Sequence, residues 1–122
     1  MTATTRIKAF DTEAFKRAFE RWDVPALLDC YAENVELVQI DRDNPPSAPR
    51  VRHGREMLEG MFNHCAAAGV TATVENGVAD EDRAAFTITC EFPNGRKVVA
   101  NAMLELRDGR IVREHEVTSG DQ

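Results

Sequence analysis

The chain has 122 residues, of which 43% are hydrophobic and 30% are charged, and its formal net charge is −6. This length favours a single domain, 1–122, and this composition is typical of a globular rather than a disordered protein. The acidic balance disfavours a nucleic-acid partner, which would need a clustered basic face.

Nothing in the sequence indicates export or a membrane span. The N-terminal stretch lacks the continuous apolar core of a secretory signal, and no apolar run is long enough to cross a bilayer. Cys30, Cys65 and Cys90 are an odd number of cysteines without a C-x-x-C spacing, which disfavours a disulfide framework and a zinc site. We therefore expect a cytoplasmic protein with reduced thiols and no membrane partner.

Helical periodicity dominates the first half of the chain. Apolar residues recur at i, i+3, i+4 and i+7 between residues 11 and 22, which predicts an amphipathic helix. Asp23 opens a second predicted helix, whose buried side would include Tyr31. A third helix is expected from Gly54 to Ala68, where Gly69 would end it.

Strands dominate the second half, because apolar residues there alternate with a period of two. The predicted strands are Val35–Ile40, Val70–Val78, Ala84–Phe92, Arg96–Leu106 and Arg110–Thr118. Asp41–Arg50 contains three prolines and is expected to form a loop. The order predicts an α+β fold in which helices cover one face of a curved, mostly antiparallel sheet.

The Arg96–Leu106 strand has two different faces. One is apolar, and it comprises Val98, Ala100, Ala102, Leu104 and Leu106. The other is mixed, and it comprises Val99, Asn101, Met103 and Glu105. By default the apolar face would pack on the helices. In the alternative, the mixed face lines a pocket and the apolar face packs on a second subunit, which predicts a homodimer through the outer sheet face.

The ordered set of elements resembles the nuclear-transport-factor-2-like superfamily, in its branch of ketosteroid-isomerase-like and SnoaL-like proteins. The resemblance covers roughly Phe10 to Thr118. It is carried by Trp22-Asp23, by Tyr31–Glu36, by His53–Glu56, by Gly95–Ala100 and by Asp108–Val112. The family implies a cone-shaped domain, in which a curved sheet wraps three helices around an internal apolar pocket, and it often implies a dimer.

The resemblance also implies which ketosteroid isomerase groups this chain lacks. The tyrosine that donates to the substrate oxygen in that enzyme matches Phe15, and the aspartate base matches Gln39. The neutral aspartic acid of its oxyanion hole matches Met103. We therefore expect no steroid isomerisation by that mechanism.

In the SnoaL-like branch, the last strand usually ends in a His-aromatic-Asp-hydrophobic pattern whose acid is a pocket residue. The corresponding run here is Glu114-His115-Glu116-Val117, so Glu116 stands at the acid position. Glu114, Glu116 and Thr118 share one strand face. Two carboxyl groups in an apolar cavity would repel each other, and burial would raise at least one pKa. A neutral acid beside an ionised base is suited to proton transfer.

The expected site combines acid–base groups with an apolar lining. Glu116 would be the acid/base, Glu114 its modulator and Gln39 the orienting group. The residues expected to contact a small apolar molecule are Phe15, Phe19, Trp22, Gln39, Met61, Phe62, Phe86, Asn101, Met103 and Thr118. No nucleotide fingerprint, phosphate loop, nucleophile–base pair or set of converging metal ligands is present, so neither a cofactor nor a metal is expected.

Two functional hypotheses follow. The first is a cofactor-independent enzyme that performs isomerisation, cyclisation, dehydration or hydrolysis on a mostly apolar compound. The second is a non-catalytic module that holds an apolar ligand or only dimerises. A closed pocket in which Gln39 and Glu116 point at one spot would favour the enzyme. A filled cone, with Glu114 and Glu116 at its rim, would favour the module.

Overall fold

The computed structural model describes residues 9–121, which form three helices and six strands. The elements are α1 (Thr12–Glu20), α2 (Val24–Leu28), β1 (Tyr31–Ile40), β2 (Arg50–His53), α3 (Arg55–Ala67), β3 (Thr71–Ala79), β4 (Arg83–Glu91), β5 (Lys97–Arg107) and β6 (Arg110–Gly120). The strands make one sheet in the order β2-β1-β6-β5-β4-β3. β1 and β6 run parallel, and the other neighbouring pairs of this sheet run antiparallel.

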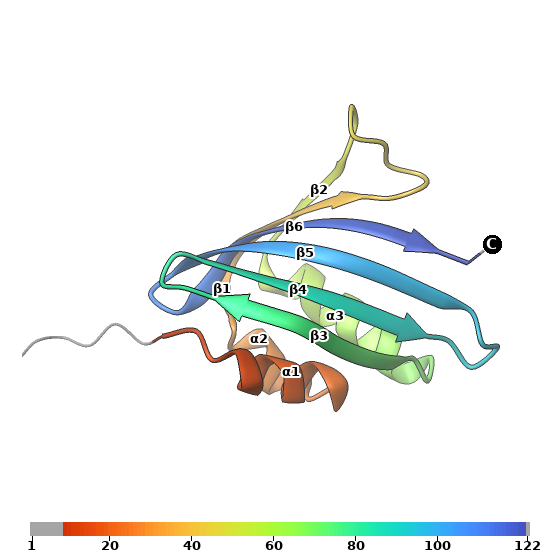
Figure 1. The fold of residues 1–122 in the computed structure, drawn as a ribbon, viewed down its shortest axis with the longest axis horizontal. Helices are drawn as coiled ribbons and strands as arrows, with labels where there is room; N and C mark the ends of the chain where they lie inside the picture. Colours follow the sequence, from red (N-terminus) through yellow and green to blue (C-terminus); the bar gives the residue numbers. More distant parts are fainter. Residues whose placement is uncertain (1–8, 122) are drawn as a thin grey trace, which may run out of the picture.

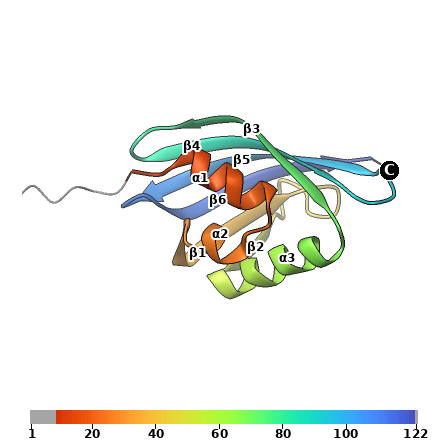
Figure 2. The same cartoon turned by 90° about the horizontal axis from the view of Figure 1, so that it is seen from below.

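The helices lie on one side of the curved sheet (Figures 1 and 2). α1 starts where the Asp11 carboxylate accepts a hydrogen bond from the amide of Ala14 at 2.9 Å, and α2 starts with the same arrangement at Asp23. Lys16 and Glu20 then tie α1 to the backbone of Val74 in β3, at 2.6 and 2.9 Å. The predicted α+β arrangement of a curved, mostly antiparallel sheet on three helices is confirmed.

Tyr31 belongs to a strand, and the prediction that it lies on the second helix is wrong. α2 ends at Leu28, and the carbonyl of Cys30 accepts a hydrogen bond from the amide of Ile111 at 2.8 Å. Pairing with β6 therefore draws the chain into the sheet from Tyr31 onward. The strand predicted from Val35 begins four residues earlier than expected, because the sheet hydrogen bonds override the helical spacing of the side chains.

The sequence analysis also missed β2. Arg50–His53 is short and rich in charge, so it lacks the apolar alternation of a strand. It nevertheless pairs antiparallel with β1, where Arg52 stands opposite Leu37. This edge strand brings Arg52 next to the inner face of the sheet.

The inner face of β5 is the apolar one, as the default assignment has it. Ala102, Leu104 and Leu106 are buried in the core, whereas Met103 is 56% exposed and Asn101 is exposed on the outer face. The expectation that Asn101 and Met103 line a pocket is therefore wrong. The helices cover the apolar face, so the reason given for a homodimer disappears and the homodimer itself stays a prediction.

Among residues 9–121, no helix is both long and apolar enough to cross a membrane.

A bulge in β3 generates a stability prediction. The β3–β4 register shifts between Glu75 and Val78, and a Cβ atom at Gly77 would lie 2.8 Å from the ring of Phe86. That ring cannot retreat easily, because it stacks on Phe15 with ring centroids 4.7 Å apart. We expect Gly77→Ala to lower the free energy of unfolding by about 1–3 kcal/mol, measured by denaturant unfolding.

Gly60→Ala is the matched control. Gly60 is exposed within α3, where a Cβ atom would meet nothing within 4 Å. Because alanine is the better helix former, this variant should gain about 0.5–1 kcal/mol. Equal effects of the two substitutions would contradict the role assigned to the Phe86 contact.

Candidate functional site

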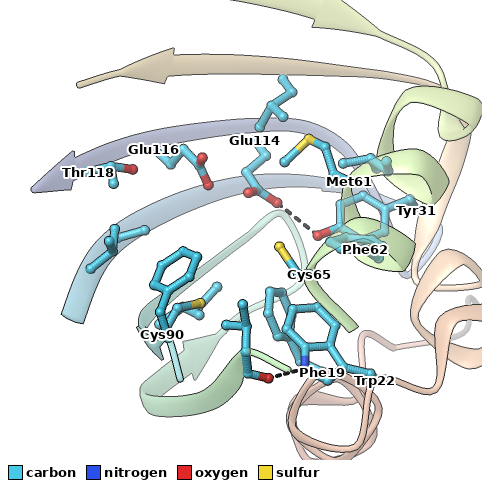
Figure 3. Close-up of a pocket in the computed structure, with 17 residues that line it drawn as sticks. Phe19, Trp22, Tyr31, Met61, Phe62, Cys65, Cys90, Glu114, Glu116 and Thr118 are labelled. Carbon is cyan, nitrogen blue, oxygen red and sulfur yellow. Dashed lines mark hydrogen bonds between the residues drawn. The ribbon is translucent and has the colours of Figure 1, made fainter. Parts of the chain in front are cut away.

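A cavity of about 210 Å³ lies between the helices and the inner face of the sheet (Figure 3). Aromatic side chains from α1 and the turn after it, from β1, from α3 and from the end of β4 form much of its wall. They are Phe19, Trp22, Tyr31, Phe62 and Phe92. The indole N–H of Trp22 donates to the carbonyl of Val70 at 2.7 Å, which fixes the ring at the base of the wall. Apolar contact therefore dominates what this cavity can offer a ligand.

The polar groups of the cavity come mainly from β6. Glu114, Glu116 and Thr118 alternate along this strand and all line the cavity. Their partners across the β5–β6 register are Leu104, Ala102 and Ala100, which carry no polar side chain. The side chains of β5 opposite the two carboxyl groups therefore offer them no hydrogen bond.

Glu114 is buried, with 6% of its surface exposed. Its Oε1 atom accepts a hydrogen bond from the Tyr31 hydroxyl at 3.0 Å (Figure 3). Burial raises the pKa of Glu114 well above its ordinary value, and the charge of Glu116 and a hydrogen bond with Glu116 raise it further, whereas the Tyr31 hydrogen bond opposes the shift. The surroundings of Glu114 therefore favour its neutral form.

Glu116 is half-buried and has a different partner. Its Oε1 atom accepts a hydrogen bond from the Gln39 amide at 2.6 Å, and the Gln39 carbonyl accepts one from the Arg52 guanidinium at 2.5 Å. The site therefore joins two carboxyl groups on one strand, one buried against Tyr31 and one hydrogen-bonded to Gln39.

The two cavity thiols are poorly suited to nucleophilic chemistry. Burial raises the pKa of Cys90 to about 11, with smaller contributions from Cys65 and Glu116. Burial also raises the pKa of Cys65. Because the thiolate is the nucleophile, both side chains are predominantly unreactive thiols at neutral pH.

Most of the residues expected at the site do surround the cavity. Those that line it are Phe19, Trp22, Met61, Phe62, Glu114, Glu116 and Thr118. Gln39 contacts it through Glu116, whereas Phe15 and Phe86 stack on each other in the core beside it. Asn101 and Met103 face the opposite side of the sheet, because the β5 face was assigned in reverse.

Two polar residues of the site were missed as functional residues. The sequence predicts Tyr31 on a helix, and it assigns Arg52 no role in the site. Pairing with β6 places Tyr31 against Glu114, and the missed strand β2 places Arg52 against Gln39. A two-residue periodicity extended back from Val35 would have included Tyr31, but no pattern in the sequence pointed to Arg52.

The correspondence of Met103 to the neutral acid of ketosteroid isomerase is also wrong, since Met103 points outward. The inward residues on either side of it, Ala102 and Leu104, have no carboxyl group. Neither Met103 nor the two inward residues beside it can therefore supply the neutral acid of ketosteroid isomerase.

Comparison with known proteins assigns the fold to one group. The profile of the SnoaL-like domain matches residues 12–114. No curated protein matches the chain at a significant level.

Solved structures show the same fold at low sequence identity. One is a protein from Kribbella flavida provisionally named a ketosteroid isomerase, with 17% identity, a TM-score of 0.69 and coverage of 87% of this chain and 73% of that one. Another is SalBIII, an epoxide hydrolase/cyclase-like enzyme in pyran ring formation in the polyether salinomycin, with 24% identity, a TM-score of 0.64 and coverage of 85% and 84%. A third, from Xanthomonas campestris, is provisionally named a polyketide cyclase, with 21% identity, a TM-score of 0.63 and coverage of 86% and 84%.

The buried Glu114 should make stability depend on pH in a defined direction. Below the carboxyl pKa of the unfolded chain, about 4.3, both states hold the proton. As pH rises above that value, the unfolded chain releases the proton while the folded protein keeps it, so this contribution to stability declines until the raised pKa of the folded state is passed. Glu114→Gln removes this decline and preserves an acceptor for Tyr31.

We therefore expect the unfolding free energy of Glu114→Gln, relative to wild type, to rise by about 1.4 kcal/mol per pH unit above about pH 4.3. Denaturant unfolding between pH 4 and pH 8 measures it. Glu91→Gln, at an exposed position of β4, is the control and should show a much smaller slope. Parallel curves for Glu114→Gln and wild type would contradict a neutral buried acid.

Proposed function

Because the chain belongs to the SnoaL-like domain family, and because its cavity pairs a buried acid with a carboxylate, we propose that it is a cofactor-independent acid–base enzyme. The proposed substrate is a small, mostly apolar compound with one oxygen function. The proposed reaction is an isomerisation or a cyclisation. The observation that carries the proposal is the asymmetry of Glu114 and Glu116, two carboxyl groups on one strand with different partners.

The asymmetry supports one role for each carboxyl group. Glu116, ionised and held by Gln39, accepts a proton from a carbon or a hydroxyl group of the substrate. Glu114, neutral and held by Tyr31, donates a proton or a hydrogen bond to the substrate oxygen. One proton is taken and one is given, so the reaction needs neither an oxidant nor a cofactor.

The walls support the choice of substrate. Aromatic and aliphatic side chains enclose most of the cavity, which favours an apolar body. Its volume of about 210 Å³ is below the range of about 300–1,000 Å³ that accommodates drug-sized ligands. A compact ring or a short chain fits this space better than a polycyclic one.

The structural neighbours are consistent with this reaction class. SalBIII is described as acting in ring formation, and two other neighbours carry the names of an isomerase and a cyclase. A pair of carboxyl groups, one donating and one accepting a proton, can perform acid–base chemistry of this kind. At these identities the neighbours establish the fold alone. Their names are consistent with the proposed reaction class.

The first functional test follows proton transfer directly. In D₂O, wild type should exchange the α-protons of small cyclic ketones or shift the double bond of small cyclic enones, and a parallel panel of small epoxides should be opened or cyclised. NMR and mass spectrometry measure both. Glu116→Gln should lower kcat by about 10²–10⁴-fold, because the amide accepts no proton.

Glu91→Gln serves as the control and should retain wild-type turnover, since its side chain is exposed on β4 away from the cavity lining. Compounds that bind wild type and Glu116→Gln equally well, with no turnover by either, would contradict the enzyme and favour the ligand-binding module.

A second test concerns steroids. We expect no conversion of a Δ5-3-ketosteroid above the level of Glu116→Gln, measured by the absorbance of the conjugated product. Phe15 lacks a hydroxyl group, Gln39 cannot act as a base, and a tetracyclic substrate is too large for a cavity of this volume. Robust conversion by wild type alone would show that Glu116 serves as the base in a cavity that expands.

A further inference from the structure

Arg52 is a half-buried cation that no direct ion pair neutralises within residues 9–121. The ion pairs of this part of the chain do not include Arg52, and its Nε–H is buried without a hydrogen-bond acceptor among the described residues. Its Nη2 atom instead contacts the Gln39 carbonyl and, at 3.0 Å, the Met61 sulfur on α3. A half-buried cation held by one amide oxygen and one thioether requires an explanation.

The contact determines the orientation of the Gln39 amide. A guanidinium group has only donors, so the Gln39 atom that faces Arg52 must be the carbonyl oxygen. The NH₂ group then faces Glu116, to which it donates at 2.6 Å. With the amide turned round, the carbonyl would face Glu116 and would require a protonated carboxyl group there.

The charges agree with the same arrangement. Arg52 supplies one positive charge, and burial and the neighbouring Arg50 lower the pKa of this guanidinium while the charge of Glu116 raises it. Gln39 lies between the two groups and is hydrogen-bonded to both. One cation balances one carboxylate, and the second carboxyl group, Glu114, stays neutral.

We propose that Arg52 is a positioning residue that, through Gln39, decides which carboxyl group of the pair is ionised. The role of Arg52 rests on the proposed function, because it assigns the base to Glu116 and the acid to Glu114. Arg52 itself does not line the cavity, so it acts through Gln39 rather than on the substrate.

The groups that face the carboxyl pair from the surrounding elements are few. They are Tyr31 and Gln39 on β1, Arg52 on β2, Cys65 on α3 and Cys90 on β4. Both thiols stay neutral at neutral pH, since burial raises the pKa of each, and burial and Glu114 raise the pKa of Tyr31 as well. Among the residues described, Arg52 is therefore the cation whose charge acts on Glu116, and Arg50 acts on Arg52 from the same strand.

The experiment is a carboxyl-resolved ¹³C NMR titration of Glu114 and Glu116 in wild type and Arg52→Met. Methionine keeps an unbranched chain against Met61 but removes the donor and the charge. The protonation midpoint of Glu116 should rise by about one pH unit, because the amide is free to turn and the cation is gone. Arg52→Lys keeps the charge, so its Glu116 midpoint should lie between those of wild type and Arg52→Met.

Two further variants separate the contact from the charge. Arg50→Met removes the same charge from the same strand at an exposed position, and it should leave the titration close to wild type. Gln39→Met removes the link and should move Glu116 in the same direction as Arg52→Met. A Glu116 midpoint that is unchanged in folded Arg52→Met, or that moves equally in Arg50→Met, would overturn the proposal.

The titration does not depend on turnover, so the two proposals can fail separately. If the midpoints shift as expected but no substrate is converted, the positioning role stands and the enzyme is wrong. If Glu116→Gln abolishes turnover while Arg52→Met leaves both the titration and the pH–rate profile unchanged, the enzyme stands and the role of Arg52 is wrong.

Discussion

Two carboxyl groups on one face of a strand, enclosed by an apolar cavity, cannot both be ionised without a strong penalty. Burial disfavours the charge on each, and each charge disfavours the other. The protein resolves this by giving the two groups unlike partners. Tyr31 and apolar neighbours surround Glu114, whereas Glu116 accepts a hydrogen bond from the amide of Gln39.

The fold supplies these partners from one corner of the sheet. β6 lies between β1 and β5, so its inward side chains meet polar groups on one side and alanine or leucine on the other. β1 provides Tyr31 and Gln39, and β2 adds Arg52 behind them. The helices close the cavity from the opposite side. In these less polar surroundings, the different hydrogen-bond partners act more strongly on the two carboxyl groups than they would in water.

The positions of these hydrogen-bond partners depend on the parallel pairing of β1 with β6. In that register Leu37 stands beside Glu114 and Gln39 beside Glu116. A shift by one residue would turn both glutamates to the outer face, as in any strand with a period of two. The β1–β6 register is irregular between Tyr31 and Glu36, and the Tyr31 hydroxyl still reaches Glu114.

Periodicity predicted the helices and the long strands, because amphipathic spacing survives in any context that buries one face. It also placed the two glutamates on one face of β6, and the resemblance to the SnoaL-like branch indicated that this face points inward. Glu114 and Glu116 were therefore found together in the sequence. The sequence did not decide which face of β5 points inward. Either its apolar face or its mixed face could line the cone if the partners of the outer surface are unknown. Tertiary structure also decided the positions of Tyr31 and Arg52. Their roles depend on hydrogen bonds between strands far apart in the chain, and local pattern carries no record of such pairing.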